Sequence, residues 1–235
     1  MKTRITLSLL FCLLALPLSV FAAQNKKCDY VEYQRLPLTK EQNGIDGSLV
    51  IMRDRKVLSS KDYDPLEGES YCNARLNLVN QDNRKISTQK LERPVAEIKT
   101  VKLIDGKPNS FDLEVDYSAG WGSYSGPVTM FIDVVGGKIK WIRAKDASTG
   151  KTEKISVMIS LKTYWKLSPS KQNQDILELA CRSTGKGDFE LIYSRYRFNG
   201  LEWIRYSKTE KGYQDFEADT DFPRENLFPP RSFSK

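Results

Sequence analysis

The chain has 235 residues, with 37 Lys and Arg against 30 Asp and Glu, and it contains no histidine. The absence of histidine excludes Ser-His-Asp and Cys-His catalysis, the usual zinc sites and the common pH switch near neutrality. Basic and acidic residues are interleaved along the chain, which is typical of a mixed-charge surface. No concentrated basic block is present to indicate nucleic-acid binding.

The first 22 residues have the pattern of a secretory signal peptide. A short positive start precedes an almost unbroken apolar run over residues 5–20, and small residues lead to a cleavage position after Ala22. Cleavage after Ala23 is the alternative. The run is too short to remain in the membrane as a spanning helix. We therefore expect a single exported domain, residues 23–235, in the periplasm or outside the cell, with no membrane span after cleavage.

Three cysteines remain in the mature chain: Cys28, Cys72 and Cys181. In an oxidising compartment two of them are expected to pair and one to remain free. Spacing alone does not decide the pair, because a disulfide depends on three-dimensional geometry. We favour Cys28 with Cys72, which would tie the mature N-terminus to the domain, and we expect the third thiol to be a small buried apolar side chain.

Apolar and polar residues alternate with a period of two through much of the chain, as they do in strands with one face in water. Residues 98–104 and 111–117 flank a loop rich in turn residues and are predicted to pair. Residues 128–134 lead through Gly136-Gly137 into a further alternating run. Because both glycines accept positive φ, this segment predicts a tight hairpin.

The clearest hairpin signal is Asn199-Gly200, which lies between an alternating run over 189–198 and a returning strand over 201–207. From residue 215 onward the chain has no period and carries several prolines. Its aromatic residues predict an extended C-terminal strap whose rings dock on the domain. These residues are Phe216, Phe222, Phe228 and Phe233.

One short helix is predicted over residues 169–181, since Ser168 and Pro169 suit an N-cap and first turn and apolar residues share one helical face. Residues 175–182 could instead form a strand. The expected fold is mainly β, built from antiparallel sheets with this one short helix. Sandwich, barrel-like and irregular propeller-like arrangements all remain open.

The glycine-rich loop over residues 118–127 carries Trp121 and Tyr124. Their flat, amphipathic rings can stack on a sugar or anchor a protein interface. The alternative is a long hairpin connection in which Trp121 folds back onto the core. We therefore treat both residues as candidate binding residues.

A second candidate binding surface is the Arg- and Tyr-rich hairpin that contains Arg195, Arg197, Arg205 and Tyr206. Arginine and tyrosine together favour protein interfaces and the recognition of anionic sugars. The alternative is ordinary cross-strand pairing, in which the arginine stems cover aromatic rings.

Neither acidic cluster of the chain predicts a metal site or a catalytic pair. The alternating acids of residues 215–221 lack the turn glycine and closing glutamate of a calcium loop. Asp112, Glu114 and Asp116 have the spacing of the wet face of a strand. We therefore expect no metal, no cofactor and no catalytic residues.

Short motifs in the C-terminal third resemble a loose group of uncharacterised exported bacterial β-rich proteins. The resemblance implies export and β-structure, and it implies no activity. The motifs are Tyr164-Trp165-Lys166, Tyr193-Ser194-Arg195-Tyr196, Asn199-Gly200, Trp203, Phe222-Pro223 and Leu227-Phe228-Pro229.

Together these features predict an exported binding or interaction protein, not an enzyme. Its partner is expected to be a protein, and it would act as an inhibitor or immunity-type partner of a toxin or envelope enzyme. A glycan-binding or glycan-processing envelope protein is the first alternative, and a structural envelope protein is the second.

Overall fold

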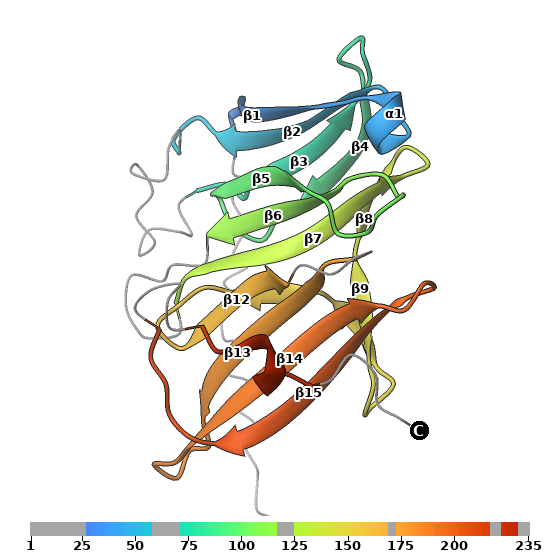
Figure 1. Cartoon of the computed structure of the whole chain (residues 1–235). Coiled ribbons are helices and arrows are strands. Elements are labelled where there is room, and N and C mark those ends of the chain that lie inside the picture. Colours follow the sequence, from blue (N-terminus) through green and yellow to red (C-terminus); the bar gives the residue numbers. More distant parts are fainter. Residues whose placement is uncertain (1–26, 58–70, 117–124, 169–172, 217–221, 230–235) are drawn as a thin grey trace, which may run out of the picture.

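The computed structural model describes residues 27–57, 71–116, 125–168, 173–216 and 222–229. Three open sheets are stacked face to face, and the C-terminal segment lies on the outer face of the third (Figure 1). The predicted mainly β, antiparallel fold is confirmed. Of the arrangements that the sequence left open, the stack is closest to a sandwich.

The first sheet has the order β1-β2-β3-β4. The short helix α1 (Lys40–Asn43) connects its first two strands. The strands are β1 (Tyr30–Leu38), β2 (Gly47–Asp54), β3 (Arg75–Val79) and β4 (Lys85–Lys90).

The second sheet, in the middle of the stack, has the order β11-β7-β6-β5, and β8 also pairs with β7. Its strands are β5 (Ala96–Val101), β6 (Ser110–Asp116), β7 (Pro127–Val135), β8 (Lys138–Trp141) and β11 (Ser156–Met158).

The third sheet has the order β10-β9-β15-β14-β13-β12, and only its β15–β9 pair is parallel. A 3-10 turn, η4 (Glu225–Leu227), follows in the C-terminal segment. The strands are β9 (Arg143–Asp146), β10 (Thr152–Lys154), β12 (Thr163–Ser168), β13 (Asp175–Ser183), β14 (Phe189–Phe198) and β15 (Trp203–Lys211).

In the middle sheet, β7 is buried on both faces. Ile132 belongs to the core between the first and second sheets, whereas Phe131 belongs to the core between the second and third. Both side chains are fully buried. A strand covered on both sides can be apolar at successive positions instead of alternating strictly, and β7 is buried from Val128 to Ile132.

The side chain of Gln34 joins the first sheet to the second. Its amide nitrogen donates to the carbonyl of Ile98 at 2.7 Å, and its amide oxygen accepts from the backbone N–H of the same residue at 2.8 Å. A register shift lies between Glu32 and Gln34 in β1. The side chain therefore satisfies backbone groups of β5 as a neighbouring strand would.

The structure confirms three of the predicted strand pairings. Gly136-Gly137 turns β7 into β8 with φ of 60° and 71°. Asn199-Gly200 lies between β14 and β15, and β5 pairs with β6.

The prediction of a helix over residues 169–181 is wrong, because residues 175–183 form β13. Ile176 faces the core shared with the second sheet, and Leu177 faces the opposite side, toward the C-terminal segment. Both faces of this strand are apolar for that reason, and its apolar residues resemble a helical face in the sequence. The alternative of a strand at this position is confirmed.

A disulfide joins Cys28 to Cys72 with a Cα–Cα distance of 5.9 Å, as expected, while Cys181 is free and buried. The predicted signal peptide lies outside the described residues. Within the described part of the chain no helix is long and apolar enough to cross a membrane.

Candidate functional site

Side chains alternate between the two faces along β14 and β15. The Arg and Tyr residues of this hairpin therefore lie on both faces of the third sheet. Arg195 is paired with Tyr206, and Tyr196 with Arg205. Tyr196 belongs to the core shared with the second sheet, so it lies on the inner face together with Arg205. Arg195, Arg197 and Tyr206 lie on the outer face, where the C-terminal segment packs. These residues therefore do not form one binding surface.

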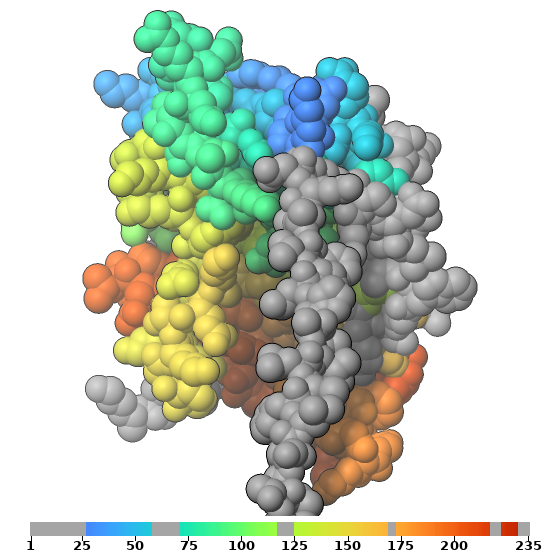
Figure 2. Space-filling model, turned by 180° about the vertical axis from the view of Figure 1, so that it is seen from behind, coloured from blue at the N-terminus to red at the C-terminus, as the bar shows by residue number. Residues whose placement is uncertain are grey.

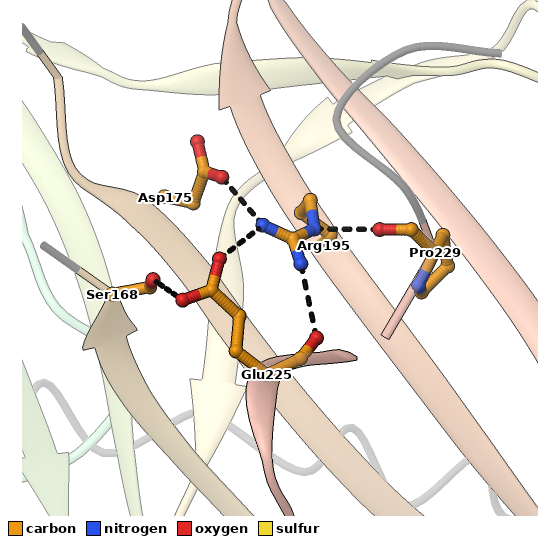
Figure 3. A network of polar contacts seen from close by, with 5 residues as sticks. All are labelled: Ser168, Asp175, Arg195, Glu225 and Pro229. Carbon is orange, nitrogen blue, oxygen red and sulfur yellow. Dashed lines mark hydrogen bonds and ion pairs between the residues drawn. The ribbon is translucent and has the colours of Figure 1, made fainter. Parts of the chain in front are cut away.

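Arg195 is the centre of a closed polar network that holds the C-terminal segment on β13 and β14 (Figure 3). Its guanidinium donates to Asp175 at 2.7 Å, to the Glu225 carboxylate at 3.0 Å and to the Pro229 carbonyl at 2.7 Å. Ser168 donates to the same Glu225 carboxylate at 2.6 Å. A further Nη2–H donates to the Glu225 carbonyl at 3.2 Å, and only 3% of the Arg195 side chain is exposed, so its role is structural.

Aromatic side chains of the C-terminal segment cover the outer face beside this network. Phe216, Phe222 and Phe228 are buried against Leu177 and Tyr193. The rings of Phe222 and Phe228 are stacked with centroids 5.3 Å apart. The apolar cluster and the Arg195 network cover this part of the outer face. The candidate ligand site therefore involves Arg205 on the inner face.

A cavity of about 240 Å³ opens where the β9–β10 hairpin approaches β14 and β15, and we call it the Arg205 pocket. In the space-filling view from behind, the yellow segment that contains β9 and β10 is exposed between the first sheet and the lower end of the third (Figure 2). Its charged and hydroxyl-bearing lining residues are Asp146, Thr149, Lys151, Glu153, Lys154, Tyr196 and Arg205.

Arg205 has more hydrogen-bond donors than the protein satisfies. Its Nη2 donates to the hydroxyl of Ser194 at 3.1 Å, and its buried Nε has no hydrogen-bond partner. Among the described residues it forms no ion pair within 4.0 Å. A guanidinium carries five N–H donors in a planar fork that suits carboxylates. This side chain therefore has the capacity to bind an anionic group.

Glu178, on β13, does not line the pocket but is bonded to Tyr196, which does. The hydroxyl of Tyr196 donates to its Oε2 at 3.2 Å. Burial raises the pKa of Glu178 to about 7, although the nearby charge of Arg205 and the Tyr196 hydrogen bond favour the ionised form. Burial also raises the pKa of Tyr196 far above its usual range. Close to neutral pH the titrating group beside the pocket is therefore Glu178.

Asp146 fixes the turn that connects β9 to β10. Its Oδ1 accepts hydrogen bonds from the backbone and the hydroxyl of both Ser148 and Thr149, at 2.6–3.0 Å. The Ser148 hydroxyl is the main cause that lowers the pKa of Asp146 to about 2. Asp146 is therefore ionised at all physiological pH values. Lys154 lies 4.6 Å from the ring centre of Trp141, which holds the hairpin from its other strand.

The sequence identified only part of this site. Arg205 was predicted and lines the pocket, and Tyr206 lines a neighbouring cavity of about 330 Å³ that also touches Arg205. Trp121 and Tyr124 lie outside the described residues. The sequence does not indicate Glu178, because the apolar residues around it resemble a helical face.

The described residues contain no group of three or more Cys, Asp or Glu side chains placed to hold a metal ion. No family model, curated protein sequence or solved structure matches the chain.

Proposed function

We propose that the protein is an exported binding protein whose ligand places an anionic group in the Arg205 pocket. The observation that carries this proposal is the guanidinium of Arg205, which faces a cavity, binds one neutral acceptor and has no ion-pair partner among the described residues. An arginine in this state is stabilised by any carboxylate or similar anion that reaches it.

The rest of the lining supports binding at this position. Lys151 and Lys154 are exposed at the mouth of the pocket and add positive charge. Tyr196 contributes an aromatic wall, and Asp146 holds the hairpin turn in one conformation. A pre-formed cavity with a few convergent polar groups is the usual form of a small-ligand site.

Export is supported by the apolar N-terminal run and by the Cys28–Cys72 disulfide, since disulfides persist in oxidising compartments. In that setting the anionic group could belong to a free small molecule, to an acidic envelope glycan or to a protein partner. All three share the carboxylate chemistry that the pocket recognises.

Calorimetric titration of the mature protein with sodium benzoate tests the proposal, because benzoate is a planar carboxylate small enough for the cavity. Benzamide, which has the same shape and no charge, is the matched ligand control. We expect benzoate to bind and benzamide not to bind.

Two variants locate the binding. Arg205→Gln should weaken benzoate binding at least about tenfold, the size expected for a charge-assisted hydrogen bond of about 1.5–3 kcal/mol. Arg143→Gln, on the same sheet but at an exposed position outside the pocket, should bind like the unmodified protein. Equal binding by Arg205→Gln, or no binding by the unmodified protein, would overturn the proposal.

A further inference from the structure

We infer that the Arg205 pocket takes a compact, singly charged carboxylate and that binding of this ligand is coupled to proton uptake by Glu178. This inference rests on the proposed function and adds to it the ligand class and its regulation. It follows from the charges around the pocket and from the contacts that connect Glu178 to Arg205.

The charges of the lining favour a monoanion. Three basic side chains, Lys151, Lys154 and Arg205, face two acidic ones, Asp146 and Glu153, so one positive charge remains. A doubly charged phosphate or sulfate would leave this site with excess negative charge. A carboxylate matches both the residual charge and the planar fork of the guanidinium.

Glu178 and a ligand in the pocket would both interact with the charge of Arg205. Glu178 is the cross-strand partner of Ser194, whose hydroxyl accepts the hydrogen bond from Arg205 Nη2. Tyr196 lines the pocket, and its hydroxyl donates to Glu178. A bound carboxylate and an ionised Glu178 would therefore both depend on the charge of Arg205 in a partly buried site. Like charges in such a site disfavour joint ionisation, and one of the two takes up a proton.

Among the described residues, Arg205 is the cation whose charge acts on Glu178, and the groups packed around that carboxyl are neutral or acidic. Trp165 is its cross-strand partner on β12, and the indole N–H of that residue is buried without a partner. The second sheet and its loops contribute apolar side chains such as Phe131 and Val157 to this core. The charge of Asp146 acts on Tyr196 and adds further negative potential.

Because the chain contains no histidine, few groups other than Glu178 titrate near neutrality. Its pKa of about 7 means that Glu178 is largely neutral at lower pH and ionised at higher pH. The neutral form leaves Arg205 available to the ligand. Anion affinity should therefore fall as the pH rises through about 7, and binding near that pH should draw a proton from solvent.

The test is calorimetric titration of the mature protein with benzoate, whose own charge does not change near neutrality. We expect binding about fivefold weaker at pH 8 than at pH 6, which corresponds to about one pKa unit of coupling. Titrations between these pH values, in two buffers with different protonation enthalpies, should show uptake of about half a proton per ligand. This measurement needs no variant.

Glu178→Gln should remove both the pH dependence and the proton uptake. Tyr196→Phe, which deletes a hydrogen bond that favours the ionised carboxylate, should move the pH transition upward. If these variants do not fold, the two-buffer titration of the unmodified protein still shows whether benzoate binding is coupled to proton uptake. Inorganic phosphate at pH 8, where it is mainly a dianion, should bind more weakly than benzoate.

The outcomes separate the two proposals. Absence of benzoate binding would contradict the proposed function and this inference together. Benzoate binding that depends on Arg205 but shows no proton uptake and equal affinity at both pH values would overturn the coupling alone. Tighter binding of phosphate than of benzoate at pH 8 would overturn the ligand class.

Discussion

The guanidinium of Arg195 and the carboxylate of Asp175 form an ion pair of 2.7 Å in which 3% and 2% of the two side chains are exposed. Arg195→Met would leave the Asp175 carboxylate buried without its cation. We expect a loss of about 3–5 kcal/mol in the free energy of unfolding, measured by urea denaturation. Arg182→Gln, an exposed arginine on the same sheet, should change it by less than about 0.5 kcal/mol. Equal effects of the two substitutions would contradict the structural role of Arg195.

The disulfide joins residues 44 positions apart and so restricts the unfolded chain. Replacing both Cys28 and Cys72 by serine should lower the free energy of unfolding by about 2–4 kcal/mol. A thiol reagent should detect Cys181 in the mature protein only after denaturation, because this thiol is buried. Detection of a free thiol in the folded protein would show that this thiol is accessible or that the disulfide is absent.

Glu178 also makes the stability of the ligand-free protein dependent on pH. Its pKa is raised by burial to about 7, against about 4.3 in an unfolded chain. The folded state therefore binds the proton more tightly, and the stability from this group is lost as the pH rises through about 7. We expect the free energy of unfolding to fall by up to about 3 kcal/mol between about pH 5 and pH 8.

Glu178→Gln supplies the control for this pH effect. The amide does not titrate, so the slope of stability against pH in this range should flatten. Urea denaturation at several pH values gives the free energy of unfolding of the unmodified protein and of Glu178→Gln. An unchanged slope would show that another group is responsible.

Gln34→Ala should separate the first two sheets locally, since the amide side chain makes both hydrogen bonds to the backbone of Ile98. The substitution leaves a partly buried backbone donor and acceptor unpaired. We expect this to lower the free energy of unfolding by about 1–3 kcal/mol. Amide hydrogen exchange at Ile98 should become faster. Gln89→Ala is the control, because its amide forms an exposed hydrogen bond to the neighbouring carbonyl of Lys90. It should leave the free energy of unfolding and the exchange rate at Ile98 nearly unchanged.

Arg205 and Tyr206 show how far the sequence alone can locate the site. Their opposite orientation follows from the period of a strand, and Asn199-Gly200 fixes the hairpin that carries them. The sequence does not show which face is covered by the middle sheet and which by the C-terminal segment, because both faces carry large side chains. That distinction makes Arg195 structural and leaves Arg205 beside a cavity.

The remaining members of the site depend on contacts between distant segments. Asp146 lies opposite Arg205 because β9 pairs in parallel with β15. The two residues are 59 positions apart in the chain. No local pattern encodes that pairing. Glu178 was missed for a different reason: its strand is apolar on both faces, and only the tertiary structure distinguishes such a strand from a short helix.

The most direct test of the proposed binding site is a crystal structure of the mature protein with benzoate at pH 6. We expect a carboxylate within hydrogen-bond distance of the Arg205 guanidinium, with Glu178 still bonded to the Tyr196 hydroxyl. Benzoate bound elsewhere, with none in the Arg205 pocket, would show that Arg205 is not the anion-binding residue.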